Sequence, residues 1–209
     1  MNKFFKRMVK QTEFYVFLII VVLSLVIQVR SGLFFANNNI VDLLRSMIVP
    51  SMYAICALLA FVSTGPDVSF PLIAALSSYL ALIVTNNLGL EDTSWFITFI
   101  IGIFFGCIMG ALNGFIIVRY NFPSLIVTLG TSSLFSGILL GAFEAERMNL
   151  PKNLAAFGKA SLITVKNAKS GLGSTLPMTF LLMIALYIIA YLVLNKTMVG
   201  RGVYAVGGD

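Results

Sequence analysis

The residue best suited to do chemistry in this chain lies in a short polar stretch between two long apolar segments. The stretch runs Ser63-Thr-Gly-Pro-Asp-Val-Ser-Phe-Pro and contains four candidates for a pathway or hinge: Thr64, Gly65, Asp67 and Ser69. A carboxylate at membrane depth costs about 2.5–3.5 kcal/mol on insertion scales, so it usually lines a pathway or has a partner. Two interpretations of Asp67 stay open: a solvated cap in a cytoplasmic hairpin, or a residue that lines a pathway or acts at a hinge.

The prolines and the glycine of this stretch predict where the flanking helices end and begin. Gly65 and Pro66 break a helix, since proline has no N–H and the residue before it disfavours the α region. Pro71 fits the first turn of the next helix, which Ser69 or Asp67 can cap.

Small hydroxyl side chains follow Pro123, which predicts a helix start. They form one polar face: Thr128, Thr131, Ser132 and Ser136. Gly130 and Gly137 allow close approach of a neighbour. An uncharged hydroxyl stripe suits a hydrogen-bonding, uncharged solute, and it equally suits helix–helix hydrogen bonds worth ~0.6 kcal/mol on average. Thr128 and Ser132 are therefore pathway candidates, with helix packing as the alternative.

Four glycines at a spacing of four form a stripe without side chains: Gly102, Gly106, Gly110 and Gly114. Such a stripe favours close packing of two helices, and a gating role is the alternative. Asn113 lies beside the stripe and is a further pathway candidate.

Several kinds of chemistry are excluded by residue type. The chain has no histidine, which removes His-based metal sites and Ser-His or Cys-His catalysis. Cys56 and Cys107 lie in different apolar segments without metal-ligand spacing, so we expect small buried apolar residues. Gly207-Gly208-Asp209 lacks the glycine, at Val206, that an intramembrane aspartyl protease would need. No catalytic residue, no metal site and no cofactor bound by this chain are expected.

Composition determines which elements position these residues. The 209 residues are 59% hydrophobic and 11% charged, with a mean hydropathy of +0.98, which is too apolar for a soluble domain. Unbroken rather than alternating apolar runs favour helices over a barrel. The prediction is an all-α polytopic membrane protein, one domain over 1–209, with six spans at about 14–29, 46–63, 68–85, 95–118, 124–143 and 176–194.

The basic residues before the first span predict its orientation. Lys3, Lys6, Arg7 and Lys10 favour a cytoplasmic N-terminus, and no cleavage site follows the first span. Arg119 and the tail after Leu194 then lie inside. The loops 86–94 and 144–175 lie outside, the second with a short surface helix around Leu154 to Ala160. The basic residues form no stripe for nucleic acid.

Three blocks carry a resemblance to ribose-type ABC permeases. Thr64-Gly-Pro-Asp-Val-Ser resembles that family's Thr-Gly-Gly-Ile-Asp-Leu-Ser, although Pro66 and Phe70 replace smaller or more flexible residues. Gly110-Ala-Leu-Asn-Gly and Phe122-Pro-Ser-Leu-Ile-Val-Thr-Leu-Gly resemble its Asn-Gly and Pro-x-Ile-x-Thr-Leu-Gly block. Lys196-Thr-Met-Val-Gly-Arg-Gly-Val-Tyr-Ala-Val-Gly-Gly-Asp resembles its Thr-x-x-Gly-Arg-x-x-Tyr-Ala-x-Gly-Gly-Asn loop.

The resemblance implies a partial type II-like importer permease for a monosaccharide or similar small polar solute, in the bacterial plasma membrane. It implies three protein partners: a cytoplasmic ABC ATPase that uses ATP, an extracytoplasmic solute-binding protein, and a second permease subunit in a homo- or heterodimer. The loop after the sixth span would contact the ATPase through Gly200, Arg201, Gly202, Tyr204 and Gly207.

Such permeases continue into further helices, so the resemblance also implies a chain truncated at its C-terminus, as a natural truncation or a fragment. The alternative function is a secondary transporter or channel subunit without an ATPase. It would need a site for a coupling ion, and Asp67 is the candidate.

Overall fold

Helices dominate the computed structural model, which describes residues 12–63, 65–90, 94–144, 150–166 and 173–207. Among these residues, six helices are long and apolar enough to cross a membrane, which confirms the predicted number. They are α2 (Thr12–Ser31), α3 (Asn37–Ser63), α4 (Phe70–Asn87), α5 (Trp95–Tyr120), α6 (Ser124–Gly137) continued by the π-helix η1 (Ile138–Ala142), and α8 (Thr179–Lys196). Shorter elements are α7 (Lys152–Lys159), β1 (Ser161–Lys166), β2 (Gly173–Pro177) and α9 (Met198–Gly207).

Two compact units divide the chain, and each is described by itself. The first comprises residues 1–46 and 162–176, and the second comprises residues 47–161 and 177–209. In the first unit, β1 pairs with β2 in a two-stranded sheet. Ser174 in β2 donates a hydrogen bond of 2.7 Å from its Oγ to the Asp42 carboxylate of α3. This exposed acid therefore has a hydrogen-bond partner in β2.

Two predicted boundaries were wrong. The second span was expected from residue 46, but α3 begins at Asn37, because its polar first turns continue the helix and Asp42 has a partner. The sixth span was expected from residue 176, but Leu176 and Pro177 belong to β2 and α8 begins at Thr179. An average of hydropathy cannot separate an apolar strand end from the helix that follows it.

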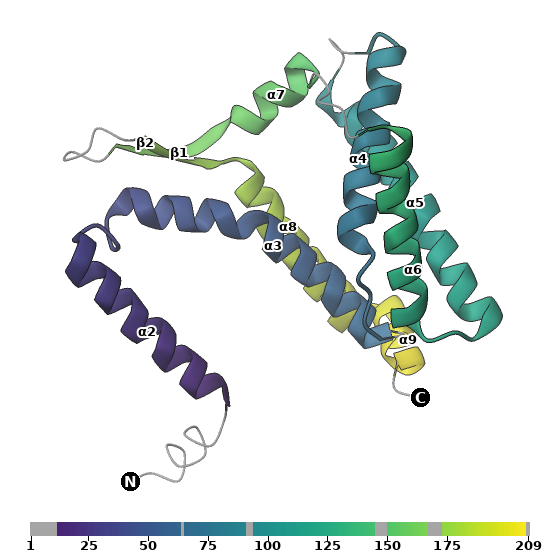
Figure 1. Ribbon diagram of the computed structural model, residues 1–209, viewed down its shortest axis with the longest axis horizontal. Coiled ribbons are helices and arrows are strands. Elements are labelled where there is room, and N and C mark those ends of the chain that lie inside the picture. Colours follow the sequence, from purple (N-terminus) through teal and green to yellow (C-terminus); the bar gives the residue numbers. More distant parts are fainter. Residues whose placement is uncertain (1–11, 64, 91–93, 145–149, 167–172, 208–209) are drawn as a thin grey trace. The chain divides into compact units, whose positions relative to one another are not determined.

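The core of the second unit is the bundle of α4, α5 and α6, which lie side by side in Figure 1. Leu76, Met109 and Phe135, one from each helix, are buried against one another. Gly102 and Gly106 lie against Ala81 and Ser77 of α4, where an added Cβ would be at 3.6 and 3.8 Å from the nearest side-chain atom. The first two glycines of the stripe, Gly102 and Gly106, thus form a helix-packing surface.

The short helix α7 lies at the end of this bundle where α5 begins. Trp95, the first residue of α5, stacks on Phe157 of α7 with ring centroids 4.3 Å apart and an interplanar angle of 15°. The short helix expected around residues 154–160 is confirmed as α7, at Lys152–Lys159. Its attachment is aromatic, which is common where a membrane protein meets the interface.

Candidate functional site

The stretch between α3 and α4 is a fixed turn. Gly65 has a φ of +115°, a value that side-chain-bearing residues rarely adopt, and its N–H bonds to the Ala60 carbonyl at 3.1 Å. Pro71 lies in the first turn of α4, as its position in the sequence predicts. Thr64 lies outside the described residues.

Ser69 holds the N-cap position of α4 but does not cap it with its side chain. Its φ and ψ of −86° and −21° are those of a helical residue, unlike the extended residue of a side-chain cap. Instead its Oγ donates to Oδ1 of Asp67 at 2.7 Å, and its N–H donates to the same oxygen at 2.6 Å. The expected cap by Ser69 is therefore wrong. Asp67, the other candidate, instead accepts the Ser69 N–H directly before the first residue of α4.

Asn113 of α5 extends this hydrogen-bonded chain. Its Nδ2 donates to the Ser69 Oγ at 2.7 Å. Ser69 is fully buried and Asn113 is only 4% exposed, so the contact is shielded from solvent. The Oδ1 of Asn113 is buried and has no hydrogen-bond partner among the described residues. One buried acceptor is thus left without a hydrogen bond among the described residues.

Helix α6 holds the same stretch from its other side. The Oγ of Ser124 donates to the Pro66 carbonyl at 3.2 Å, and the Val68 N–H donates to Oγ1 of Thr128 at 3.4 Å. Both hydroxyl residues are buried. Sequence reasoning selected Thr128 and missed Ser124, although the position directly after Pro123 at a predicted helix start was a usable signal.

A cavity of about 450 Å³ opens beside Asp67, and we call it the Asp67 cavity. Its polar wall is made by Ser63, Asp67, Asn113 and Ser124. Its remaining wall is Cys56, Leu59, Ala60, Phe70, Gly110, Gly114, Ile117 and Val203. An added Cβ at Gly110 or Gly114 would meet nothing within 4 Å. Gly110 and Gly114 therefore border open space, whereas Gly102 and Gly106 pack against α4.

The expected burial of the two cysteines is wrong, since Cys56 and Cys107 are both exposed. Cys56 lines the Asp67 cavity, whereas Cys107 lines none of the cavities described for this chain. A membrane protein has an apolar outer surface, so an apolar residue need not be buried inside the protein.

The predicted hydroxyl stripe divides between two environments. Thr128 faces the turn before α4, and Thr131 is buried with its Oγ1 bonded to the Val127 carbonyl at 3.1 Å. Ser132 and Ser136 line a separate cavity of about 530 Å³ with Leu72 of α4. Ser132 is thus not brought together with Asp67.

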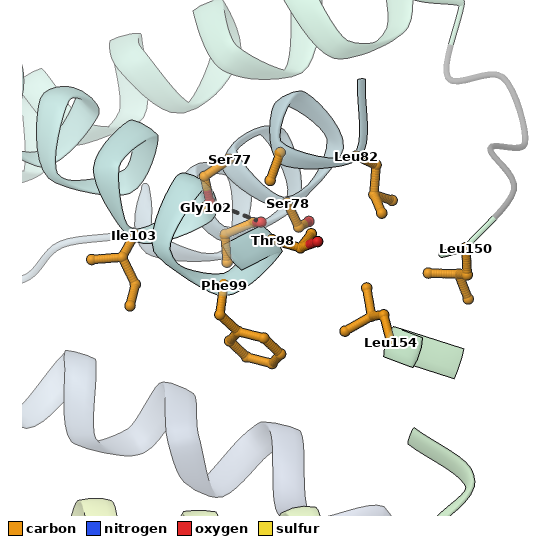
Figure 2. Close-up of a pocket in the computed structure, with 11 residues that line it drawn as sticks. Ser77, Ser78, Leu82, Thr98, Phe99, Gly102, Ile103, Leu150 and Leu154 are labelled. Atoms are coloured by element: carbon orange, nitrogen blue, oxygen red, sulfur yellow. Dashed lines mark hydrogen bonds between the residues drawn. The ribbon is translucent and has the colours of Figure 1, made fainter. Parts of the chain in front are cut away.

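A third cavity, of about 480 Å³, lies between α4, α5 and the segment that leads into α7. Figure 2 shows residues of its lining, where Leu82 and Leu154 point toward one another and Phe99 lies beside them. The hydroxyls of Ser77 and Ser78 donate to carbonyls of their own helix at 3.2 and 2.9 Å. This mainly apolar cavity suits a polar solute less well than the Asp67 cavity does.

The tail expected as a loop is the helix α9. Thr197 turns the chain between α8 and α9, and its Oγ1 accepts a hydrogen bond from the Gly200 N–H at 3.2 Å. The same hydroxyl donates to the Val193 carbonyl at 2.6 Å. A threonine that accepts from the third residue of a helix is an effective N-cap, which explains why a glycine-containing segment is helical.

The glycines of α9 have different surroundings. A Cβ at Gly200 would collide with the carbonyls of Val193 and Leu194, and one at Gly207 would collide with those of Val62 and Ser63. A Cβ at Gly202 would meet nothing within 4 Å. The candidates Arg201 and Tyr204 are exposed. Gly200 therefore permits the tight α8–α9 turn, and Gly207 permits contact with the end of α3.

Comparison with known proteins gives one matching family. The profile of the branched-chain amino acid transport system / permease component family matches residues 39–209. The chain is 27% identical over 194 residues to the D-allose transport system permease protein AlsC of Escherichia coli, covering 92% of this chain and 55% of the relative. It is 29% identical over 196 residues to the fructose import permease protein FrcC of Rhizobium meliloti, covering 92% and 52%.

A further relative is the autoinducer 2 import system permease protein LsrC of Klebsiella pneumoniae, 29% identical over 207 residues that cover 98% of this chain and 55% of the relative. The chain therefore spans about half the length of the curated relatives it matches. No solved structure matches it significantly.

Proposed function

Because this chain belongs to the family of branched-chain amino acid transport system permease components, we propose that it is a permease subunit of an ATP-driven importer of a monosaccharide or similar small polar solute. The observation that carries the proposal is the family match over residues 39–209, with relatives named as permeases for D-allose, fructose and autoinducer 2. Six membrane-length helices among the described residues support a multi-pass membrane protein.

The translocation pathway in this proposal passes the Asp67 cavity. Asp67, Ser69 and Asn113 form a hydrogen-bonded chain at its wall, and Thr128 holds the backbone behind them. Hydroxyl and amide groups with one carboxylate suit a neutral, hydroxyl-bearing solute. Gly65 acts as the hinge, since its φ of +115° sets the angle between the end of α3 and this wall. Ser132 belongs to a second, hydroxyl-lined section of the pathway.

Helix α9 is the proposed contact for a cytoplasmic ATPase. Arg201 and Tyr204 are exposed on it and are the proposed contacts. Gly202 has no side chain and has open space around it, so it is left out of the proposed contact. Gly200 and Gly207 fix the backbone of α9 against α8 and α3. A helix held in this way moves as a rigid element with the helices it contacts, which suits transmission of an ATP-driven movement. The remaining partners proposed are an extracytoplasmic solute-binding protein and a second permease subunit.

The proposed location is the bacterial plasma membrane, with the N-terminus in the cytoplasm. In the second unit, several connections between helices lie at the same end of the bundle. The turn before α4, the α5–α6 connection and α9 share one end, where Arg119 lies in the last turn of α5, Lys196 in the last turn of α8 and Arg201 in α9. Lys152 and Lys159 of α7 lie at the other end, so the proposed orientation rests on the basic residues before the first span.

A secondary transporter would need a coupling-ion site. Among the described residues, no group of three or more His, Cys, Asp or Glu side chains could hold a metal ion. The family match and the relatives named as import permeases favour the ATP-driven importer.

The proposal is tested by Arg201→Glu in the full-length protein, with Gly202→Ala as the matched control on the same helix. We expect Arg201→Glu to leave membrane insertion intact and to reduce co-purification of the ATPase, while Gly202→Ala retains it. Solute uptake that persists after deletion of the ATPase gene would contradict the proposal and favour the secondary transporter.

A further inference from the structure

We propose that the Asp67 cavity is a water-filled binding site for a hydroxyl group of the transported solute, at the end of the bundle where α9 lies. This inference rests on the proposed function and adds the site, the residues that bind, and the chemistry they require. All the residues that line the cavity belong to the second compact unit.

The first argument is the unpartnered acceptor. The hydroxyl of Ser69 has one hydrogen, which goes to Asp67, so Ser69 can only accept from Asn113. The Asn113 amide must therefore present its NH₂ to Ser69 and keep its oxygen free. That oxygen is buried and has no partner among the described residues. A buried acceptor without a partner is destabilising, so a donor that reaches this oxygen stabilises the site. Because the oxygen itself is buried, a movement of the cavity wall must first expose it.

The second argument is the type of donor. Asp67 is half-buried at the same wall, and a carboxylate offers about four lone-pair positions, of which Ser69 uses two. Asp67 and Asn113 are thus two acceptors at one cavity wall, while Ser124 uses its hydrogen on the Pro66 carbonyl. A molecule that brings hydroxyl hydrogens satisfies this wall, whereas an anion is repelled by the carboxylate.

The third argument is the size and shape of the cavity. A volume of about 450 Å³ lies within the ~300–1,000 Å³ typical of small-molecule sites. Gly110 and Gly114 keep its wall free of side chains, since a Cβ at either would project into open space. Apolar residues such as Phe70 and Ile117 complete the lining. A mainly apolar wall with a few polar groups is the usual form of a site for a small organic molecule.

The fourth argument is the position of α9. Val203 of α9 lines the cavity, and Gly207 lies directly against the carbonyls of Val62 and Ser63 at the end of α3. Movement of α9 therefore changes the cavity wall. A solute site at this place can be opened or closed by the partner that moves α9.

Water access is tested with the two native cysteines. Full-length versions that retain only Cys56 or only Cys107 are reacted with a charged, membrane-impermeant methanethiosulfonate in inside-out vesicles. Only a thiolate reacts and thiolates form in water, so we expect Cys56 to react roughly tenfold faster than Cys107 or more. Equal, slow labelling of both cysteines would overturn the water-filled cavity.

Solute binding is tested by protection of Cys56 with D-allose, D-fructose, D-ribose and D-xylose as probes. We expect at least one sugar to slow labelling in the parent protein and to have no effect in Asn113→Leu. As a variant that retains the polar wall, Gly110→Val should fill the cavity and slow labelling, while Gly130→Val, equally open but outside the cavity, should not. Absence of protection by all four sugars would overturn the solute site.

These readouts separate the site from the proposed function. An importer whose uptake depends on its ATPase while Cys56 stays inaccessible would overturn the Asp67 cavity and leave the function standing. A protein with a sugar-protected Cys56 that transports without an ATPase would overturn the function and leave the site standing.

Discussion

Ser69, before the first residue of α4, accepts a hydrogen bond of 2.7 Å from Asn113 of α5, which lies 44 positions further along the chain. Ser69→Ala removes the acceptor for the Asn113 amide and one of the donors to Asp67. Because this leaves a buried NH₂ unpartnered, we expect the protein to lose about 1–3 kcal/mol of stability. The measurement is thermal unfolding in detergent. Ser78→Ala is the control, since Ser78 is exposed and its hydroxyl, within the part of the chain that the structure describes, bonds only to the Ala75 carbonyl of its own helix. Equal melting temperatures for the two variants would contradict the structural importance of the Asn113 contact.

Gly65→Ala should also be destabilising, for a backbone reason. No atom lies within 4 Å of the added Cβ, so the expected cost of about 1–3 kcal/mol comes from the φ of +115° alone. Gly130→Ala is the matched control, because it lies in α6 with equal free space and an alanine there favours the helix. The melting temperature should fall for Gly65→Ala and rise for Gly130→Ala. An unchanged melting temperature for Gly65→Ala would mean that the positive φ of Gly65 does not fix this turn.

Six spans could be predicted from the sequence because an unbroken apolar run of this length has few other stable structures. The start of α3 could not, since the partner of Asp42 is Ser174, 132 positions away. The pairing of β1 with β2 could not be predicted for a different reason. The segment Ser-Leu-Ile-Thr-Val-Lys contains β-branched residues but is short and has no regular alternation of apolar and polar side chains, so its local signal is weak.

The polar wall of the site was largely predictable, and its arrangement was not. Asp67, Ser69 and Asn113 could be predicted because polar side chains within or beside membrane-spanning segments are costly and usually have a function or a partner. Their hydrogen-bonded order, and the inclusion of Cys56 and Val203 in the same cavity, depend on how α3, α5 and α9 pack. Periodicity alone could not separate the packed Gly102 and Gly106 from the open Gly110 and Gly114, since all four share one stripe.

Phe157→Ala should release α7 from the bundle without affecting the Asp67 cavity. Stacking of Trp95 on Phe157 is worth about 0.5–1.5 kcal/mol, so we expect roughly 2- to 10-fold faster trypsin cleavage at Lys152 and Lys159 in right-side-out vesicles. Phe104→Ala is the control, because Phe104 lies on the exposed side of α5 and contacts Phe105 rather than α7. Unchanged cleavage in Phe157→Ala would show that the aromatic stack does not hold α7.

Gly207→Ala and Gly202→Ala form the sharpest pair of variants, because they add the same methyl group to the same helix. The Gly207 methyl would collide with the carbonyls of Val62 and Ser63, whereas the Gly202 methyl meets no atom within 4 Å. We therefore expect Gly207→Ala to push α9 away from the end of α3. Uptake of solute driven by ATP should fall roughly 5-fold or more, which is the lower end of the range typical for coupling between two sites. Gly202→Ala should transport normally. Both should appear in the membrane at equal levels, which immunoblotting checks. Equal uptake by the two variants would mean that the α9–α3 contact does not carry the coupling, since the collision is the main difference between them.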